Sequence, residues 1–229
     1  YGTTPLLLGE WSGRLSNSGE HVVLSDPDGQ ITLDFQYDDS APWAFTPDGY
    51  GATLELVDPT TTTADRFGEP TSWRGSVEFG GTPGTTGAGP TGIVINEILT
   101  LSDLPETDLV ELQNVSTASI DIGGWYLSDT GDDFFKFQVP VGTTIAAGAY
   151  RVFDESDFNP GGGSNPTDFA LSAGGDEVWL IEANAQGQPI RFADAVRFDA
   201  TQNGVTLGRV PNGSTAYDLF PLSENTAGT

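Results

Sequence analysis

The chain has 229 residues, with 33 acidic side chains against 8 basic ones and a formal net charge of −25. This charge repels phosphate groups, so neither nucleic acid nor an anionic membrane is expected as a partner. No run approaches about 18 apolar residues, so no segment is expected to insert into a membrane. Cysteine is absent and histidine occurs once, which excludes disulfides, thiolate chemistry and a zinc site built from His and Cys ligands.

A β-hairpin is predicted near the start of the chain. Two short apolar runs, Val22–Leu24 and Ile31–Tyr37, flank the segment Asp26–Gly29. That segment has Asp at its first, Pro at its second and Gly at its fourth position, which is typical of a type I turn. Gly and Pro also separate the short apolar runs in the rest of the sequence, which indicates strands joined by turns.

A linker follows at Gly80–Gly92, which reads GGTPGTTGAGPTG. It has no large apolar side chain and cannot contribute to a core. The sequence therefore predicts two domains, residues 1–84 and 92–229, joined by a Gly/Thr/Pro linker at 85–91.

Further runs of strand length follow the linker, all rich in β-branched or aromatic residues. They are Gly92–Leu99, Asp108–Gln113, Phe134–Val139, Tyr150–Asp154, Glu177–Ile181 and Ile190–Phe198. The nearest candidate for a helix, Ser102–Leu112, contains Pro105 and is expected to be a loop that enters a strand. The prediction is an all-β protein.

The two sides of the linker share an internal repeat. Leu15, Val22, Leu24, Tyr37 and Leu54 align with Leu171, Val178, Leu180, Phe198 and Leu207, and the gaps between aligned blocks fall at turns. The repeat is lopsided, because residues 1–84 correspond only to the part of the C-terminal domain that follows about Asn165. Nothing ahead of the first copy corresponds to Gly92–Phe158.

The sequence resembles the bacterial lamin tail domain family. The resemblance is carried by GIVINEIL, DLVELQNVSTASIDIGGWYLSD, FQVPVGTTIAAGAYRVF and GVTLGRVPNGS, in that order, and by WSGRLSNSGEHVVLSDPDG and GGTPG in the first copy. It implies one complete domain at about 92–229 and the C-terminal half of a second at about 1–84. The fold it implies is a tandem of immunoglobulin-like β-sandwiches, the N-terminal one incomplete, in a family that usually serves secreted or cell-surface proteins without catalysis.

Half a sandwich would expose a wide apolar face, and such a face normally marks a missing partner. We therefore expect the chain to begin inside a domain and to need strands from elsewhere. They could come from an upstream fragment cleaved from the same precursor, from a neighbouring subunit that donates a strand, or from a segment outside this sequence. A different, rearranged fold is the remaining alternative.

Carboxylate clusters are the candidate metal sites, because calcium binds several oxygen ligands. The first candidate is Asp129, Asp132 and Asp133 in SDTGDD, and the others are Asp38 with Asp39, and Asp154 with Glu155 and Asp157. So acidic a chain produces such clusters by chance, and a solvated turn is the alternative at each. Calcium is the one candidate cofactor, and no other cofactor is expected.

Three further residues carry alternatives. His21 could belong to a Ser-His-Asp arrangement or be a solvated strand residue. Lys136, the single lysine, could form an isopeptide bond if buried, but strand alternation places it opposite Phe135 and Phe137. Trp43 could stack on a sugar or pack against the protein.

No constellation of residues supports an enzyme. The sequence favours a non-catalytic, extracellular structural or adhesion module that acts through protein–protein contacts, as a subunit of a surface assembly or filament. The expected partner is the upstream fragment or neighbouring subunit that completes the first sandwich. The alternative is a carbohydrate- or calcium-binding accessory module of a secreted enzyme.

Overall fold

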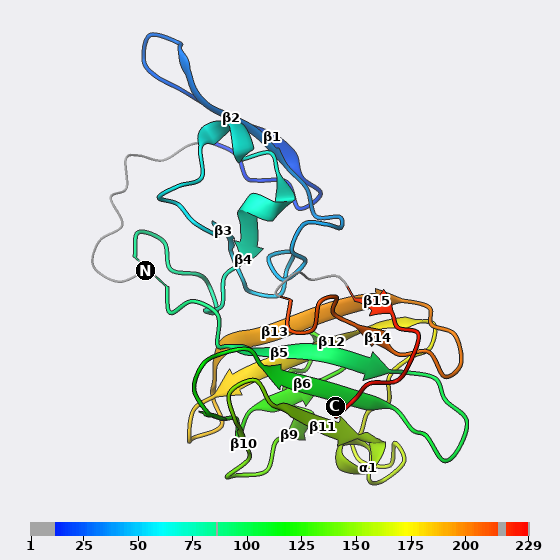
Figure 1. Cartoon of the computed structure of the whole chain (residues 1–229). Coiled ribbons are helices and arrows are strands. Elements are labelled where there is room, and N and C mark those ends of the chain that lie inside the picture. The colour runs from blue at the N-terminus through cyan, green and yellow to red at the C-terminus, as the bar shows by residue number, and fades with distance from the viewer. Residues whose placement is uncertain (1–11, 86, 215–218, 229) are drawn as a thin grey trace. The chain divides into compact units, whose positions relative to one another are not determined.

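The computed structural model describes residues 12–85, 87–214 and 219–228. The chain divides into two units, Tyr1–Gly89 (unit 1) and Pro90–Thr229 (unit 2), shown in Figure 1. The division falls inside the Gly-rich segment in which the sequence predicts a boundary. No helix among the described residues is long and apolar enough to cross a membrane.

Unit 2 is a sandwich of two antiparallel sheets (Figure 1). The first has the order β11 (Tyr150–Asp154), β6 (Leu109–Asn114), β5 (Ile93–Leu99), β14 (Leu207–Gly208) and β15 (Phe220–Pro221). The second has the order β13 (Pro189–Asp199), β12 (Gly175–Ala183), β8 (Tyr126–Ser128) and β9 (Phe137–Gln138). A short pair, β7 (Ile120–Asp121) and β10 (Thr144–Ile145), completes the strands of this unit among the described residues.

The core of unit 2 lies between these sheets. Each strand of a sandwich turns alternate side chains inward, and β5 and β13 come into contact although they belong to different sheets. The core residues include Ile93, Ile95 and Ile98 of β5, which are fully buried. Trp125 and Leu127 are core residues too, as the alternation in GGWYLSD predicts.

Two local predictions differ from the structure. Residues Glu155–Phe158 form one helical turn, α1, because Asp154 and Asp157 make a reciprocal capping box at its start. The predicted strand Phe134–Val139 shrinks to β9, because the two residues that pair with β8 are Phe137 and Gln138.

Unit 1 holds two separate antiparallel pairs. These are β1 (Glu20–Ser25) with β2 (Ile31–Tyr37), and β3 (Leu54–Leu56) with β4 (Trp73–Gly75). Two 3₁₀ turns, Ala64–Arg66 and Pro70–Ser72, lie between β3 and β4. No residue of β1, β2 or β3 is fully buried, in contrast to β5, in which every residue is.

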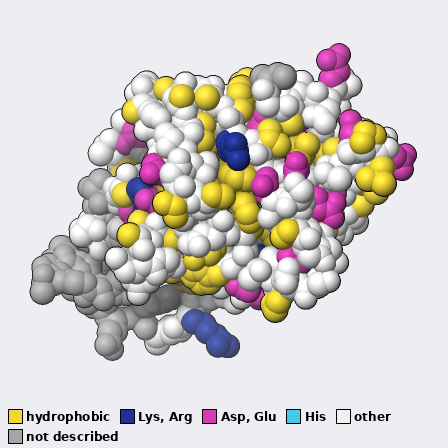
Figure 2. Space-filling view, turned by 90° about the horizontal axis from the view of Figure 1, so that it is seen from below, with side chains coloured by type: hydrophobic (Ala, Val, Ile, Leu, Met, Phe, Trp, Pro, Cys, Tyr) yellow, Lys and Arg dark blue, Asp and Glu magenta, His cyan; other side chains and the backbone are white. Residues whose placement is uncertain are grey.

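The surface is acidic, as the composition requires. On the face shown in Figure 2, Asp and Glu side chains are spread among apolar and neutral ones, whereas Lys and Arg appear in few places.

Candidate functional site

An apolar groove lies in unit 1. Its volume is about 400 Å³. Six large side chains form its wall: Leu15, Val22, Phe35, Tyr37, Leu54 and Trp73. Asp38, Asp39 and Asp48 also line the groove, and no Lys or Arg is among the described residues that do so.

Strand pairing and ring packing hold this wall together. Val22 of β1 is the cross-strand partner of Phe35 on β2, so the two side chains share a face. The ring of Phe35 stacks on Trp73 with centroids 5.4 Å apart and meets Phe67 edge-on at 5.8 Å. The Trp73 indole N–H donates to the Phe67 carbonyl oxygen (2.7 Å). The wall is therefore formed within unit 1 itself.

The hairpin β1–β2 has the same pairing register as the hairpin β12–β13. The pairs Glu20–Tyr37, Val22–Phe35 and Leu24–Leu33 occupy the places of Asp176–Phe198, Val178–Val196 and Leu180–Asp194. Both ladders then shift register at the same step, after Leu24 in one and after Leu180 in the other. A β-bulge is a specific local feature, so its recurrence at the same step relates the two hairpins closely.

The turns that lead into the two hairpins also match. The Ser16 amide donates to the Glu20 carboxylate (2.9 Å), and the Ser172 amide donates to the Asp176 carboxylate (2.8 Å). In each turn the amide two residues after the serine donates to the serine hydroxyl, at 3.1 and 3.2 Å. These side-chain bonds set the entry angle of the first strand in the same way.

The pair β3–β4 corresponds to the pair β14–β15. Leu54 faces Gly75 as Leu207 faces Pro221. The bonds at the end of each pair correspond as well: the Ser76 amide donates to the Thr53 carbonyl (2.7 Å), and the Leu222 amide to the Thr206 carbonyl (2.9 Å).

The two sets of strands differ in what covers them. Five of the six wall residues have counterparts in unit 2 that are core residues: Leu171, Val178, Val196, Phe198 and Leu207. Leu171 is 5% exposed, whereas Leu15 is 53% exposed. In unit 2 the strand β5 pairs with β14, and β6 continues that sheet, whereas β3 has only β4 beside it in the part of the chain that the structure describes. In unit 2 the apolar side chains of β5 and β6 share one core with these residues.

A buried ion pair of unit 2 is replaced by leucines in unit 1. Arg209, 1% exposed, donates to the Asp194 carboxylate (2.7 Å) and through Nε to the Ile95 carbonyl (2.6 Å). The Ile95 amide donates to Asp194 in turn (2.7 Å), so the pair clamps the bulged backbone of β5. By the register of the hairpins, Leu33 and Leu56 stand in the places of Asp194 and Arg209. Unit 1 therefore lacks the clamp and has a more apolar face.

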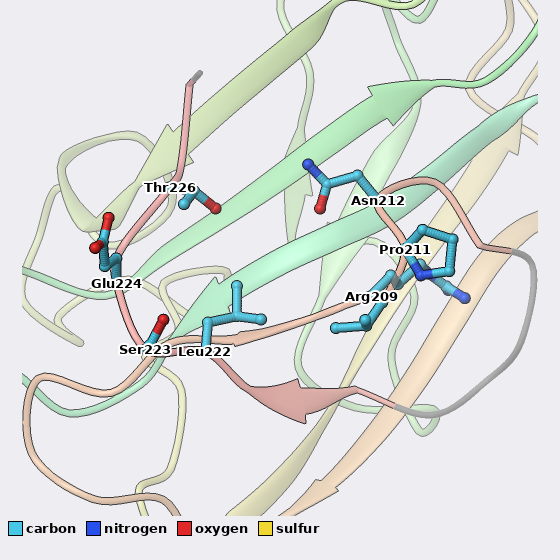
Figure 3. A pocket seen from close by; sticks show the side chains of 8 residues that line it. Arg209, Pro211, Asn212, Leu222, Ser223, Glu224 and Thr226 are labelled. Atoms are coloured by element: carbon cyan, nitrogen blue, oxygen red, sulfur yellow. The ribbon is translucent and has the colours of Figure 1, made fainter.

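A second pocket, of about 250 Å³, belongs to unit 2. Figure 3 shows it between the segment that follows β14 and the segment that follows β15. The charged residues in its wall are Arg209 and Glu224, and the guanidinium of Arg209 is engaged in the clamp on β5.

Residues 86–196 match the family model of the Lamin Tail Domain. The chain contains a lamin tail domain. Its fold is the immunoglobulin-like β-sandwich that the resemblance implies, and the match covers one copy, in unit 2. The strands β14 and β15, which extend the five-stranded sheet, lie beyond the matched residues. A comparison with curated proteins finds no match for the chain.

The three residues of the predicted calcium site lie in a loop of the lamin tail domain. Asp129 pairs with Lys136 (2.5 Å), and the Asp133 carboxylate accepts the Phe135 amide (2.9 Å). The Asp132 amide donates to the hydroxyl of a neighbouring threonine. Nowhere in the described residues do three His, Asp or Glu side chains converge in a way that could hold a metal ion. Calcium at Asp129, Asp132 and Asp133 stays a prediction, which a calcium titration can test.

Lys136 is partly buried: its side chain is 17% exposed and is paired with Asp129. Alternation fails here because the strand β9 begins only at Phe137, so the backbone before it is not extended as a regular strand.

The other acidic clusters form turns and caps. The Asp38 carboxylate accepts the Ser40 amide (2.9 Å), which lowers the pKa of Asp38. Asp154 and Asp157 cap α1. Each carboxylate thus satisfies backbone amides of its own loop.

The two candidate residues for chemistry in unit 1 lie apart from the groove wall. His21 is exposed on β1 and contacts the Asp34 carboxylate. Trp43 is half-buried, and its amide donates to the Ser40 carbonyl (3.1 Å). Neither residue lines the groove.

Proposed function

We propose that this chain is a non-catalytic, extracellular structural or adhesion module that acts through protein–protein contacts, as a subunit of a surface assembly or filament. The observation that carries the proposal is the groove in unit 1. Five of the six side chains of its wall have counterparts in unit 2 that are core residues. An apolar face that is built like a domain interior but left open is typical of a protein-binding surface.

Residues 1–84, in this proposal, are the C-terminal half of a second lamin-tail-like sandwich. Support comes from the shared register, the shared bulge and the shared entry turn of β1–β2 and β12–β13. It also comes from the correspondence between β3–β4 and β14–β15. What unit 1 lacks, among its described residues, is any counterpart of β5 and β6.

The partner is a protein that supplies the absent strands, either an upstream fragment of the same precursor or a neighbouring subunit. Strand addition suits unit 1, because β3 is an edge strand and edge strands present unpaired backbone groups. In this proposal, the protein binds its partner by incorporating strands of the partner into the sandwich of unit 1.

Photo-cross-linking in cells that produce the full chain tests this function. A photoreactive residue replaces Leu15 in the groove or, as the control, Ile31, which is 60% exposed and does not line the groove. We expect an adduct with another polypeptide from position 15 and none from position 31. Absence of any intermolecular adduct from position 15 would contradict the function.

A further inference from the structure

The lamin tail domain of this chain shows what covers an equivalent face. Ile93, Ile95 and Ile98 of β5, with Val110 and Leu112 of β6, share one core with the counterparts of the groove residues. The strand β5 pairs with β14, with Leu207 facing Ile98, and β6 pairs with β5. The occupant that fits the groove is therefore an apolar β-hairpin, with one strand against β3 and the other outside it.

The charge in the lining of the groove indicates what the turn of that hairpin carries. In unit 2 the chain beyond β13 lies beside the turn between β5 and β6: the hydroxyl groups of Thr201 and Thr100 are 2.6 Å apart, and the Asn203 amide group donates to Asp103 (2.9 Å). By the register of the hairpins, Ser40 of unit 1 stands in the place of Thr201, and Asp38 and Asp39 directly precede it.

Asp38 and Asp39 line the groove together with Asp48, and no described Lys or Arg in the lining offsets them. A hairpin whose turn carries Lys or Arg would pair with these carboxylates, whereas an acidic turn would be repelled by them. A second copy of this chain is disfavoured as the occupant, because two molecules of charge −25 repel each other.

We infer that the groove of unit 1 binds an apolar β-hairpin whose strands take the places that β5 and β6 take in unit 2, and whose turn carries Lys or Arg against Asp38 and Asp39. The inference rests on the proposed function and names the kind of partner.

Three labelled peptides are the probes, titrated into the full chain. The first has the sequence of residues 91–116, which contains both strands β5 and β6 and their turn. The second carries Asp103→Lys, Glu106→Lys and Asp108→Lys, which make the turn basic. The third carries the same three changes together with Ile95→Asp and Ile98→Asp, which remove the apolar face.

The basic-turn peptide is expected to bind at least about fivefold more tightly than the acidic-turn peptide at low salt, with the ratio falling toward one at high salt. The peptide without the apolar face is expected to bind at least about tenfold more weakly than the basic-turn peptide. Absolute affinities will be modest, because unit 1 has Leu33 and Leu56 where the lamin tail domain has its clamp and because an isolated hairpin is only marginally stable in water.

Two chain variants locate the binding site. Leu15→Asp changes an exposed residue of the groove. Ile31→Asp changes an aliphatic residue of the same size and similar exposure that does not line the groove. Leu15→Asp is expected to weaken the basic-turn peptide by at least about tenfold, and Ile31→Asp by less than about twofold. Circular dichroism of both variants checks that the fold is kept, and Val22→Asp gives a second reading at the groove if Leu15→Asp alters it.

Equal effects of the two chain variants, equal binding of all three peptides, or no binding of the basic-turn peptide would overturn the inference. Should position 15 still cross-link to another polypeptide in cells, the proposed function would stand and the partner would be of another chemistry. Absence of the adduct from position 15 would contradict the function itself, whatever the peptides show.

Discussion

Arg209 and Asp194 form a buried ion pair in unit 2 that also satisfies both backbone groups of Ile95. Removing one partner leaves a buried charge without its counterion, which costs about 3–5 kcal/mol. We predict that Arg209→Leu lowers the free energy of unfolding of unit 2 by that amount. Urea unfolding of the full chain, followed by the indole NMR signals of Trp125 and Trp179, measures the change.

The double variant Asp194→Leu/Arg209→Leu recreates the leucine pair of unit 1. It removes both charges, so it is expected to be more stable than Arg209→Leu alone, yet less stable than the parent chain because the backbone groups of Ile95 lose their partners. A double variant no more stable than the single one would show that the pair is not coupled as the structure indicates.

Asp108 makes unit 2 sensitive to pH. Burial raises the pKa of Asp108 to about 6, although its carboxylate accepts the Leu171 amide. A carboxyl group whose pKa is higher in the folded than in the unfolded protein stabilises the fold at low pH, and that stabilisation is lost as the pH rises through the folded pKa. We predict that the free energy of unfolding falls from pH 4 to pH 6, with ~1 kcal/mol from this group after solvent screening.

Asp108→Asn should remove that part of the pH dependence, because the amide oxygen can still accept the Leu171 N–H while the group no longer titrates. Burial also raises the pKa of Glu111 and of Asp176, so some dependence of the same sign will remain. Urea unfolding at a series of pH values provides the comparison, and identical slopes for the variant and the parent would contradict the assignment to Asp108.

At the scale of elements, Gly19 fixes the entry into the hairpin β1–β2. It has φ of +81°, and an added Cβ would lie 2.5 Å from the Tyr37 carbonyl oxygen. Gly29, in the turn of the same hairpin, has φ of +83° and nothing within 4 Å of an added Cβ. Both substitutions by Ala incur backbone strain of about 1 kcal/mol, but only Gly19→Ala adds a clash with the backbone.

We therefore predict that Gly19→Ala destabilises unit 1 clearly more than Gly29→Ala. The indole NMR signal of Trp73, whose N–H donates to Phe67 inside this unit, follows its unfolding. Similar unfolding midpoints for the two variants would show that Gly19 is not required for the chain to enter β1. The similarity to the turn before β12 would then be a weaker argument for relating the two hairpins.

Most of the longer strands could be predicted from the sequence, whereas the short helix could not. The hairpin β1–β2 and the strands β5, β6, β11, β12 and β13 follow from β-branched runs between turn residues. The internal repeat, seen as aligned residues, led to the expectation of an exposed apolar face, and the groove lies at these positions. By contrast, the helical turn α1 arises from a local capping box within DESD, a pattern that an acidic chain also produces by chance.

The clamp on β5 could not be predicted, and the reason is physical. Arg209 and Asp194 are far from Ile95 in the sequence, and which polar groups meet in a core depends on the register of three strands. The contact of Asp129 with Lys136 could not be predicted either, because side-chain direction in an irregular loop does not follow from composition. The calcium site rests on the density of carboxylates alone and stays a prediction.

At the scale of the whole molecule, one chain carries two related hairpins with different surroundings. In unit 2 the five-stranded sheet, which contains the β5–β6 hairpin, covers β12–β13, and Val178, Leu180, Val196 and Phe198 are core residues. In unit 1 Val22, Phe35 and Tyr37 line an open groove whose lining also contains three carboxylates. A lamin tail domain and a hairpin of the same register thus occur in one acidic polypeptide. This arrangement supports the proposal that a protein partner completes unit 1.

Residue-resolved amide hydrogen exchange of the full chain, without added partner, tests this account most directly. The amides of β1–β2 and β12–β13 have the same pairing register, so any difference in protection reports what covers each hairpin. We predict exchange at least about a hundredfold faster in β1, β2 and β3 than in β12, β13 and β14. Equal protection of the two sets would show that unit 1 is closed, and the account of an open module that takes up strands would be wrong.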